Sequence, residues 1–341
     1  MRNRLRSRSE EFSVDNLGGI PSYGSAMTPG VAFVFPGQGS QVVGMGREFY
    51  DSEPVARTLF EQASQVLGYD VAALCLQGPA EKLNLTEYTQ PALLTVSVVA
   101  LRLLERAGLR PSAVAGHSLG EYTAVVAAGG LPFPDAVALV HKRGRYMQEA
   151  VEAGRGLVCA LLGLERPIVT EICRAASAWG VVAPANFNAP GQIVIAGERA
   201  AVEEAARLAK AKGCRKVIPL PVSVPVHTSL MQSAAKRLAV DVDRVPMQDL
   251  TVPLINNVEA KPICSAPDVR TSLVRQLSSS VLWEESVQGL VKMGIHTLVE
   301  VGPGKVLTGL AKRIAPELRL LNMHDRVSLA STVEALAAAR P

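Results

Sequence analysis

A serine flanked by glycines is the residue best suited to chemistry, because residues 116–120 read Gly-His-Ser-Leu-Gly, a Gly-x-Ser-x-Gly sequence. Small apolar residues at 112–115 predict a buried strand before it, and residues 121–128 predict a helix after it. A serine in such a strand-to-helix turn stands clear of the sheet, above unpaired N–H groups of the helix. The pattern indicates an acyl-transfer nucleophile at Ser118, and a plain Gly/Ser-rich turn is the alternative.

A serine hydroxyl needs a base within hydrogen-bond reach, and the chain has five histidines. His117 adjoins Ser118, but neighbouring side chains diverge at such a turn. His227 follows a run with three prolines that would stiffen its loop, and fixed placement favours a catalytic base. His227 is therefore the better candidate, although the residues alone slightly favour an ordinary loop histidine.

The composition favours an α/β protein that positions these residues on a buried sheet. The 341 residues are 48% hydrophobic and only 4% aromatic, so alanine, valine and leucine supply most of the core. A net charge of +4 is too weak to argue for nucleic acid. No apolar run reaches the roughly 18–20 residues that span a bilayer. We expect a cytoplasmic protein that binds neither nucleic acid nor membrane.

Histidine spacing predicts no metal site, and the pattern of cysteines predicts no disulfide framework. The cysteines are scattered singly and odd in number, which is typical of reduced thiols in the cytoplasm. The histidines lack ligand spacing. These residues are Cys75, Cys159, Cys173, Cys214 and Cys264, and His117, His141, His227, His296 and His324.

Residues 1–28 differ from the rest and predict a disordered N-terminal extension. Alternating arginines followed by glycine, serine and proline resemble a transit peptide, but the acidic residues Glu10, Glu11 and Asp15 count against one. Met27 stands just before the first strand and is a candidate natural start of translation.

The remaining elements divide between a large catalytic domain, at 29–154 and 223–341, and a small domain at 155–222. In the small domain the order β-α-β-β-α-β predicts a ferredoxin-like fold. In the large domain we expect strands at 31–35, 252–255 and 297–301, and helices at 54–67, 91–107, 134–153, 268–279, 283–293, 305–314 and 329–339.

Several further motifs follow one another along the chain. They are Phe-Pro-Gly-Gln-Gly-Ser-Gln at 35–41, Lys-Arg-Gly at 142–144, Ala-Asn-Phe-Asn at 185–188, Arg-Gln-Leu at 275–277 and Glu-Val-Gly-Pro-Gly at 300–304, beside the segments 116–122 and 223–227. Together and in this order they resemble the acyltransferase family of fatty-acid and polyketide synthesis, and within it the bacterial malonyl-CoA:acyl-carrier-protein transacylases. The resemblance covers about residues 30 to 315.

The resemblance implies a Ser-His pair without an acidic third member. Ser118 would be the nucleophile and His227 its base, with the backbone carbonyl of Gln276 holding the imidazole. The backbone N–H groups of Gln38 and Leu119 would form the oxyanion hole, in which one donor contributes about 3 kcal/mol.

Arg143 would bind the carboxylate of a malonyl group, since a guanidinium can hold both oxygens at once. Without the resemblance, a solvated helix arginine is the simpler interpretation of this residue. Leu119 matches malonyl-using members of the family, whereas Val226 departs from the serine or phenylalanine often found there. We therefore expect malonyl as the substrate, and Val226 leaves strict selectivity open.

The implied fold is an α/β-hydrolase-like domain with a parallel sheet and an inserted small subdomain. The implied activity is malonyl transfer from coenzyme A to the phosphopantetheine thiol of acyl carrier protein, through an acyl-serine, in fatty-acid synthesis. We expect a monomer that needs no cofactor. Because carrier proteins are acidic, Lys305, Lys312 and Arg313 are candidate docking residues, although a charged helix face exposed to solvent is the simpler explanation.

Three alternatives stay open at this point. A serine hydrolase or thioesterase would normally add an acidic residue and a glycine-rich oxyanion loop, which the sequence lacks. A trans-acting acyltransferase of a polyketide synthase would carry nearly the same motifs. A non-catalytic module that binds carrier protein would not need Ser118, His227 and Arg143 intact.

Overall fold

The computed structural model describes residues 27–152, 154–222 and 224–337. The predicted extension therefore lies outside the described residues, apart from Met27 and Thr28, and so does Ser223. Thr28 is buried, and its backbone N–H donates to the Arg110 carbonyl at 2.8 Å. No helix within the described ranges is long and apolar enough to cross a membrane.

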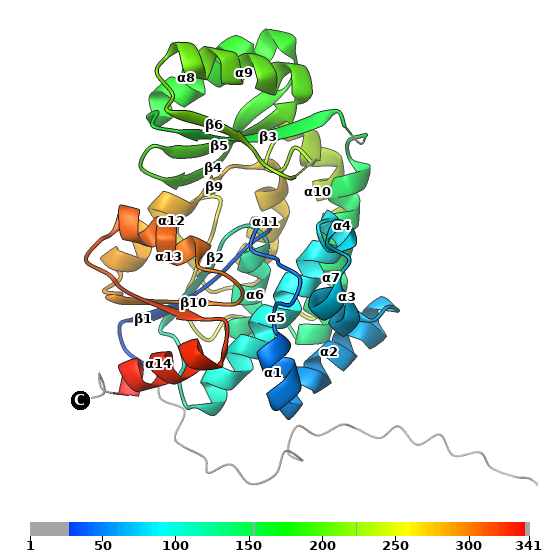
Figure 1. Cartoon of the computed structure of the whole chain (residues 1–341), viewed down its shortest axis with the longest axis vertical. Helices are drawn as coiled ribbons and strands as arrows, with labels where there is room; N and C mark the ends of the chain where they lie inside the picture. Colours follow the sequence, from blue (N-terminus) through cyan, green and yellow to red (C-terminus); the bar gives the residue numbers. More distant parts are fainter. Residues whose placement is uncertain (1–26, 153, 223, 338–341) are drawn as a thin grey trace, which may run out of the picture.

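A six-stranded sheet forms the lower part of the molecule (Figure 1). All its paired strands are parallel except β8, which runs antiparallel to β7. The carboxyl ends of neighbouring parallel strands therefore meet at one edge, where sites of such folds form. The order is β11 (Arg319–Met323), β10 (Thr297–Val301), β1 (Val31–Phe35), β2 (Ala113–Gly116), β7 (Leu254–Ile255) and β8 (Pro262–Ile263).

Strand β1 is buried on both faces and packs into two separate cores. Phe33 and Phe35 point into the core formed with α5 (Thr86–Arg106), α6 (Leu119–Ala127) and α7 (Phe133–Glu149). Ala32 and Val34 point into a second core with α12 (Trp283–Lys292) and α13 (Val306–Ile314). Figure 1 shows these two helix layers on either side of the sheet. A strand covered on both faces has to be apolar throughout, as this one is.

Helix α5 begins at Thr86, five residues before the predicted start at Pro91. Proline lacks an N–H and leaves the carbonyl four residues earlier without a helix partner. That carbonyl, of Glu87, instead lies 3.1 Å from Nδ1 of His141 on α7. The expectation that Pro91 opens the helix was wrong because a neighbouring helix satisfies the group that proline leaves free.

Among the described residues, seven further α-helices lie in the lower part. Helix α2 has its predicted bounds, and Gly68 ends it with φ 75°. Helices α1, α3, α4 and α10 were not predicted. The bounds are α1 Arg47–Ser52, α2 Pro54–Leu67, α3 Val71–Gln77, α4 Ala80–Leu83, α10 Gln232–Arg244, α11 Ala266–Arg275 and α14 Arg326–Ala337.

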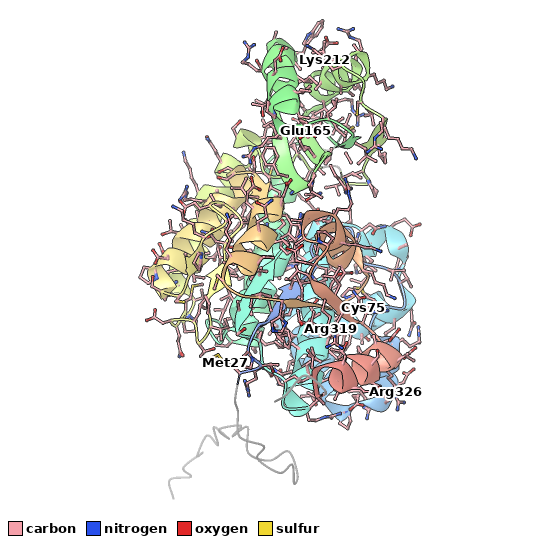
Figure 2. All side chains as sticks on the ribbon, turned by 90° about the vertical axis from the view of Figure 1, so that its left-hand side faces the viewer. Met27, Cys75, Glu165, Lys212, Arg319 and Arg326 are labelled. Carbon is pink, nitrogen blue, oxygen red and sulfur yellow. The ribbon has the colours of Figure 1, made fainter. Side chains whose placement is uncertain are left out.

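A second, five-stranded sheet forms the upper part of the molecule (Figure 1). Its strands pair antiparallel, except that β9 runs parallel to β4. Figure 2 shows Glu165 and Lys212 in this part, well away from Cys75, Arg319 and Arg326 in the lower part. The order is β6 (Lys216–Pro219), β3 (Gly156–Leu162), β5 (Gln192–Glu198), β4 (Val182–Ala189) and β9 (Val281–Leu282).

The two faces of the small sheet have different surroundings. Leu161 and Ile195 pack under α8 (Arg166–Ala176) and α9 (Arg199–Ala211). Val158 and Val194 point the other way and line the cleft that contains Ser118. The predicted α/β class is confirmed as a mostly parallel six-stranded sheet with a second, smaller antiparallel sheet.

Candidate active site

Ser118 occupies a strained turn between β2 and α6. Its φ of 51° and ψ of −107° lie outside the regions that non-glycine residues ordinarily adopt. The flanking glycines permit the turn, because a Cβ on Gly120 would lie 2.0 Å from the Phe35 carbonyl oxygen, and one on Gly116 equally close to Gly120. Strand β2 thus delivers the hydroxyl to the carboxyl edge of the sheet.

Asn257, just after β7, holds this strained turn from the neighbouring strand. Its Oδ1 accepts a hydrogen bond from the Ser118 backbone N–H at 2.7 Å. Its Nδ2 donates to the Gly116 carbonyl at 2.7 Å. One fully buried amide therefore satisfies both sides of the turn that carries the serine.

The structure brings Ser118, His227 and Gln276 together. Ser118 Oγ lies 2.8 Å from His227 Nε2, and His227 Nδ1 lies 2.8 Å from the Gln276 backbone oxygen. A carbonyl only accepts, so Nδ1 carries the proton and Nε2 is free to accept from the serine hydroxyl. This is the tautomer that a general base requires.

His227 is itself buried and held in an unusual backbone conformation. Its φ is 60°, and its backbone N–H donates to the Leu277 carbonyl at 3.1 Å. Burial, reinforced by the positive charge of Arg143, lowers the pKa of its imidazole from 6.5 to about 3. The ring therefore stays neutral, and able to accept a proton, well into the acid range.

The low pKa of His227 predicts an unusual pH profile for acylation of Ser118. For an imidazole with its ordinary pKa, the neutral fraction falls about ten-fold between pH 7.5 and pH 5.5. Because the pKa of His227 is about 3, we expect the rate of acyl-enzyme formation to change by less than about two-fold over that range. Rapid-quench mass spectrometry of the first turnover measures this rate. A fall with a midpoint near pH 6.5 would contradict the assignment.

Arg143 is a buried cation beside the serine, not a solvated helix arginine. Its side chain is 1% exposed and projects from α7. Its Nη2 donates to Ser118 Oγ at 3.2 Å and to Gln276 Oε1 at 2.8 Å, and Nη1 donates to Gln90 Oε1 at 2.8 Å. All these partners are neutral, and Nε has none among the described residues. A buried guanidinium with neutral partners is suited to an anionic substrate group.

Gln38 and Leu119 flank the same cleft. Leu119 opens α6, and the first N–H groups of a helix have no carbonyl within it. Gln38 follows β1, and its side chain is tied back because Nε2 donates to Thr86 Oγ1 at 3.1 Å. Both residues therefore border the space above Ser118 in which an oxyanion would form.

His117 is directed away from the serine. Its Nε2 lies 2.8 Å from Asn188 Oδ1, and its ring packs edge-on against Trp283 with centroids 5.6 Å apart. The structure thus pairs Ser118 with His227 and places the adjacent histidine against the small sheet.

Sequence reasoning missed three buried polar residues of this site: Asn257, Glu121 and Gln90. Signals for them exist. Glu121 and Gln90 are polar residues within apolar helices, where burial without a partner is costly. Asn257 directly follows a buried strand, where parallel sheets gather functional side chains.

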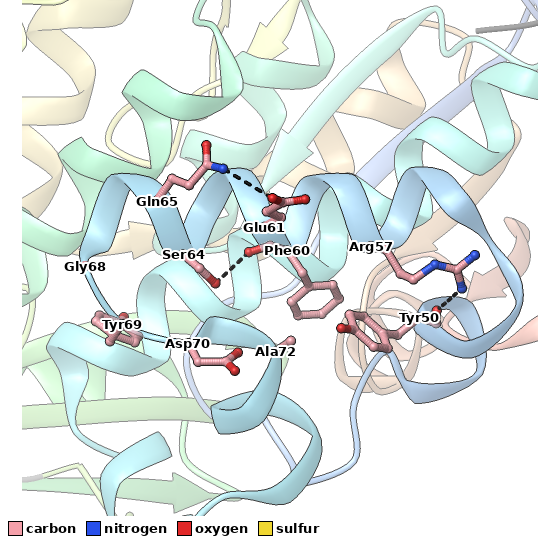
Figure 3. Close-up of a pocket in the computed structure, with 10 residues that line it drawn as sticks. All are labelled: Tyr50, Arg57, Phe60, Glu61, Ser64, Gln65, Gly68, Tyr69, Asp70 and Ala72. Carbon is pink, nitrogen blue, oxygen red and sulfur yellow. Dashed lines mark hydrogen bonds between the residues drawn. The ribbon is translucent and has the colours of Figure 1, made fainter.

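The cleft is narrow, about 70 Å³, and lies between the two sheets. A far wider hollow of about 720 Å³ lies beside α2 and α3 (Figure 3). Its arginine, Arg57, already donates to the Tyr50 carbonyl at 2.8 Å. The wide hollow contains none of the predicted site residues. The cleft is lined by Gln38, His117, Ser118, Leu119, Arg143, Met147, Val158, Asn186, Val194, Leu220, Val222, Val226 and His227.

Other predicted features lie outside the cleft lining. Lys305, Lys312 and Arg313 are exposed at the two ends of α13. Arg313 donates to Gln192 Oε1 at 2.6 Å, so part of its charge is engaged with the small sheet. Within the described ranges, no group of three or more histidine, cysteine or acidic side chains could hold a metal ion.

Comparison with known proteins identifies one family. Residues 32–327 match the acyl transferase domain model. The malonyl CoA-acyl carrier protein transacylase of Escherichia coli K12 is 48% identical over 304 residues, covering 89% of this chain and 98% of the relative. The relative with that name from Bacillus subtilis is 43% identical over 307 residues, covering 90% and 97%.

Solved structures of malonyltransferases are similar to this chain as well. The acyl carrier protein S-malonyltransferase of Vibrio cholerae superposes with a TM-score of 0.86 at 46% identity, covering 89% of this chain and 99% of that one. A malonyl-transacylase solved in complex with the acyl carrier protein of a type II polyketide synthase gives 0.88, with the same identity and coverage.

Proposed function

The chain belongs to the acyl transferase family, and from this premise we propose that it is an [acyl-carrier-protein] S-malonyltransferase of fatty-acid synthesis. It moves a malonyl group from coenzyme A to the phosphopantetheine thiol of acyl carrier protein. The observation that carries the proposal is the contact of Ser118 with His227 beside the buried guanidinium of Arg143.

In the first half-reaction, Ser118 Oγ attacks the thioester carbonyl of malonyl-CoA while His227 Nε2 takes the hydroxyl proton. The backbone N–H groups of Gln38 and Leu119 stabilise the oxyanion. The tetrahedral intermediate collapses, the carbon–sulfur bond breaks, and the imidazolium returns its proton to the departing thiolate. The Gln276 carbonyl keeps the imidazole in the required tautomer and stabilises its charged form.

The second half-reaction repeats these steps with the carrier thiol. His227 accepts the thiol proton as the sulfur attacks the malonyl ester on Ser118. A thioester forms, the ester bond breaks, and the proton returns to Ser118 Oγ. Coenzyme A and the carrier protein carry the same pantetheine arm, so one entrance serves both partners.

Arg143 selects malonyl by pairing its guanidinium with the free carboxylate of the acyl group. Val226 stands where the family often has serine or phenylalanine. It gives the cleft an apolar wall next to His227. Malonyl is the expected acyl group, and methylmalonyl-CoA should be compared with malonyl-CoA as a substrate.

We also propose that residues 155–222 form a ferredoxin-like subdomain inserted into an α/β-hydrolase-like catalytic domain. The element order β3-α8-β4-β5-α9-β6 supports this division. Strand β9 then ties the two parts together, because it leaves the large part to pair with β4.

The test is to incubate the protein with malonyl-, methylmalonyl- or acetyl-CoA and a holo carrier protein, and to weigh the products. We expect malonyl-carrier protein as the main product. Free malonate as the main product, with carrier protein in excess, would indicate a hydrolase instead. Fatty-acid and polyketide carriers should both be offered, because one similar transacylase is complexed with a polyketide carrier.

A further inference from the structure

Glu121 is a fully buried carboxylate to which the proposed mechanism gives no part. It lies in the first turn of α6, three residues after the serine. Its Oε1 accepts from Ser272 Oγ at 2.9 Å, and its Oε2 accepts from the Asn257 backbone N–H at 3.1 Å and from Gln276 Nε2 at 2.7 Å. Burying a carboxylate among neutral donors is costly, so a specific role would account for it.

The Gln276 side chain bridges Glu121 and Arg143. A carboxylate only accepts hydrogen bonds and a guanidinium only donates them. Gln276 Nε2 therefore faces Glu121, and its Oε1 faces Arg143 Nη2 at 2.8 Å. Nε2 also donates to the Ser118 carbonyl at 2.9 Å. Only one of the two amide orientations satisfies all these partners.

We propose that Glu121 is a positioning residue, which fixes the Gln276 amide with its oxygen toward Arg143 and so sets the guanidinium for the malonyl carboxylate. The inference rests on the proposed function. The same residue, Gln276, presents its backbone oxygen to His227 Nδ1. Glu121 thus acts on Arg143, which binds the substrate carboxylate, through the side-chain amide of Gln276. The backbone of Gln276 is fixed next to His227, the base.

Loss of the acceptor at residue 121 removes the 2.7 Å hydrogen bond of Gln276 Nε2 and leaves the Ser118 carbonyl as its partner, so the rotated form of the amide becomes more populated. In the rotated form its NH₂ group faces the guanidinium, and two donors meet where a donor met an acceptor. Arg143 then has to move, and its contact with Ser118 Oγ at 3.2 Å is lost with it. Transfer of malonyl should suffer more than transfer of acetyl, because acetyl has no carboxylate for the arginine to bind.

The geometry requires a hydrogen-bond acceptor at residue 121, facing Gln276 Nε2, and does not require a negative charge there. Burial raises the pKa of its carboxyl to about 7, so neutral and ionised forms coexist near neutral pH. The neutral form still offers a carbonyl oxygen to Gln276. Glutamine at this position mimics that form, whereas methionine has a similar volume and no comparable acceptor.

The experiment compares Glu121→Gln and Glu121→Met by the ratio of malonyl to acetyl acylation of Ser118, each measured as kcat/KM. We expect the ratio to stay within about three-fold of the parent protein for E121Q and to fall at least about ten-fold for E121M. Glu300→Met is the matched control. Glu300 is an equally buried carboxylate that accepts from the backbone N–H groups of Leu307 and Thr308. E300M should lower the melting temperature and leave the ratio unchanged.

Two outcomes would overturn the proposal: equal losses of malonyl and acetyl transfer in E121M, or a ratio in E121Q as low as in E121M. If E121M does not fold, Glu121→Asp replaces it, because its carboxylate is one methylene too short to reach Gln276. The ratio should then fall in E121D, and an unchanged ratio would also overturn the proposal. Failure of the parent protein to transfer malonyl would refute the proposed function instead.

Discussion

Replacing Ser118 with alanine should abolish the acyl-enzyme. Without the hydroxyl, nothing at the end of β2 can attack the thioester, and removal of the serine nucleophile from a serine protease costs about 10⁶ in rate. The fold should survive, because Asn257 bonds the backbone N–H of residue 118 and not its side chain. Intact mass spectrometry after incubation with malonyl-CoA should show one malonyl group on the parent protein and none on S118A.

Ser112→Ala is the control for this result. Its hydroxyl donates to the Val31 carbonyl at the far end of β2, so S112A should acylate normally. Persistent single acylation of S118A would identify another nucleophile. The first to examine are Ser278, Ser279 and Ser280, which line a second hollow that His227 also borders.

Replacing Arg143 with alanine should weaken malonyl acylation at least about a hundredfold and acetyl acylation less than about ten-fold. Two charge-assisted hydrogen bonds to a carboxylate contribute about 1.5–3 kcal/mol each, and every 1.4 kcal/mol is about ten-fold in rate. The smaller loss with acetyl reflects the contact of Arg143 with Ser118 Oγ. Acyl-enzyme formation from each acyl-CoA measures both effects.

Arg145→Ala is the control, because Arg145 lies on the same helix but is exposed and paired with Glu149. This variant should change neither rate.

The R143A variant should also show a changed pH dependence. Because the charge of Arg143 helps to lower the pKa of His227, its removal should move the acid limb of acetyl acylation to higher pH. Equal losses with malonyl and acetyl would remove Arg143 from carboxylate recognition.

The sequence predicted the regular elements well where local chemistry defines their ends. Strands at 31–35 and 297–301 have their predicted bounds. So does α2, which has proline at its first position and glycine after its last. These elements are recognisable because apolar runs and their flanking residues lie within one short window of sequence.

Elements that depend on distant partners were not predictable. Strand β9 is two residues long and exists because it pairs with β4 almost a hundred residues earlier in the chain. Strand β11 is only partly buried at the edge of the large sheet and lacks a continuous buried run. Its pairing with β10, not its own composition, makes it a strand.

The active-site residues differ in the same way: some lie in a contiguous motif, and others depend on distant contacts. The motif around Ser118 is contiguous, so the position of the nucleophile follows from the sequence alone. The roles of Asn257 and Glu121 depend on hydrogen bonds that span 139 and 155 residues, which no local pattern encodes. Arg143 was ambiguous for the same reason, since only the packing of α7 shows that it is buried.

The order of synthesis adds a consequence. Ser118 and Arg143 leave the ribosome long before His227, Asn257 and Gln276, which complete the pocket. A nascent chain therefore carries the hydroxyl without its base or the amides that hold the turn. We therefore expect a chain to become able to capture an acyl group only after translation has passed Gln276 and the segment from His227 to Gln276 has docked beside Ser118.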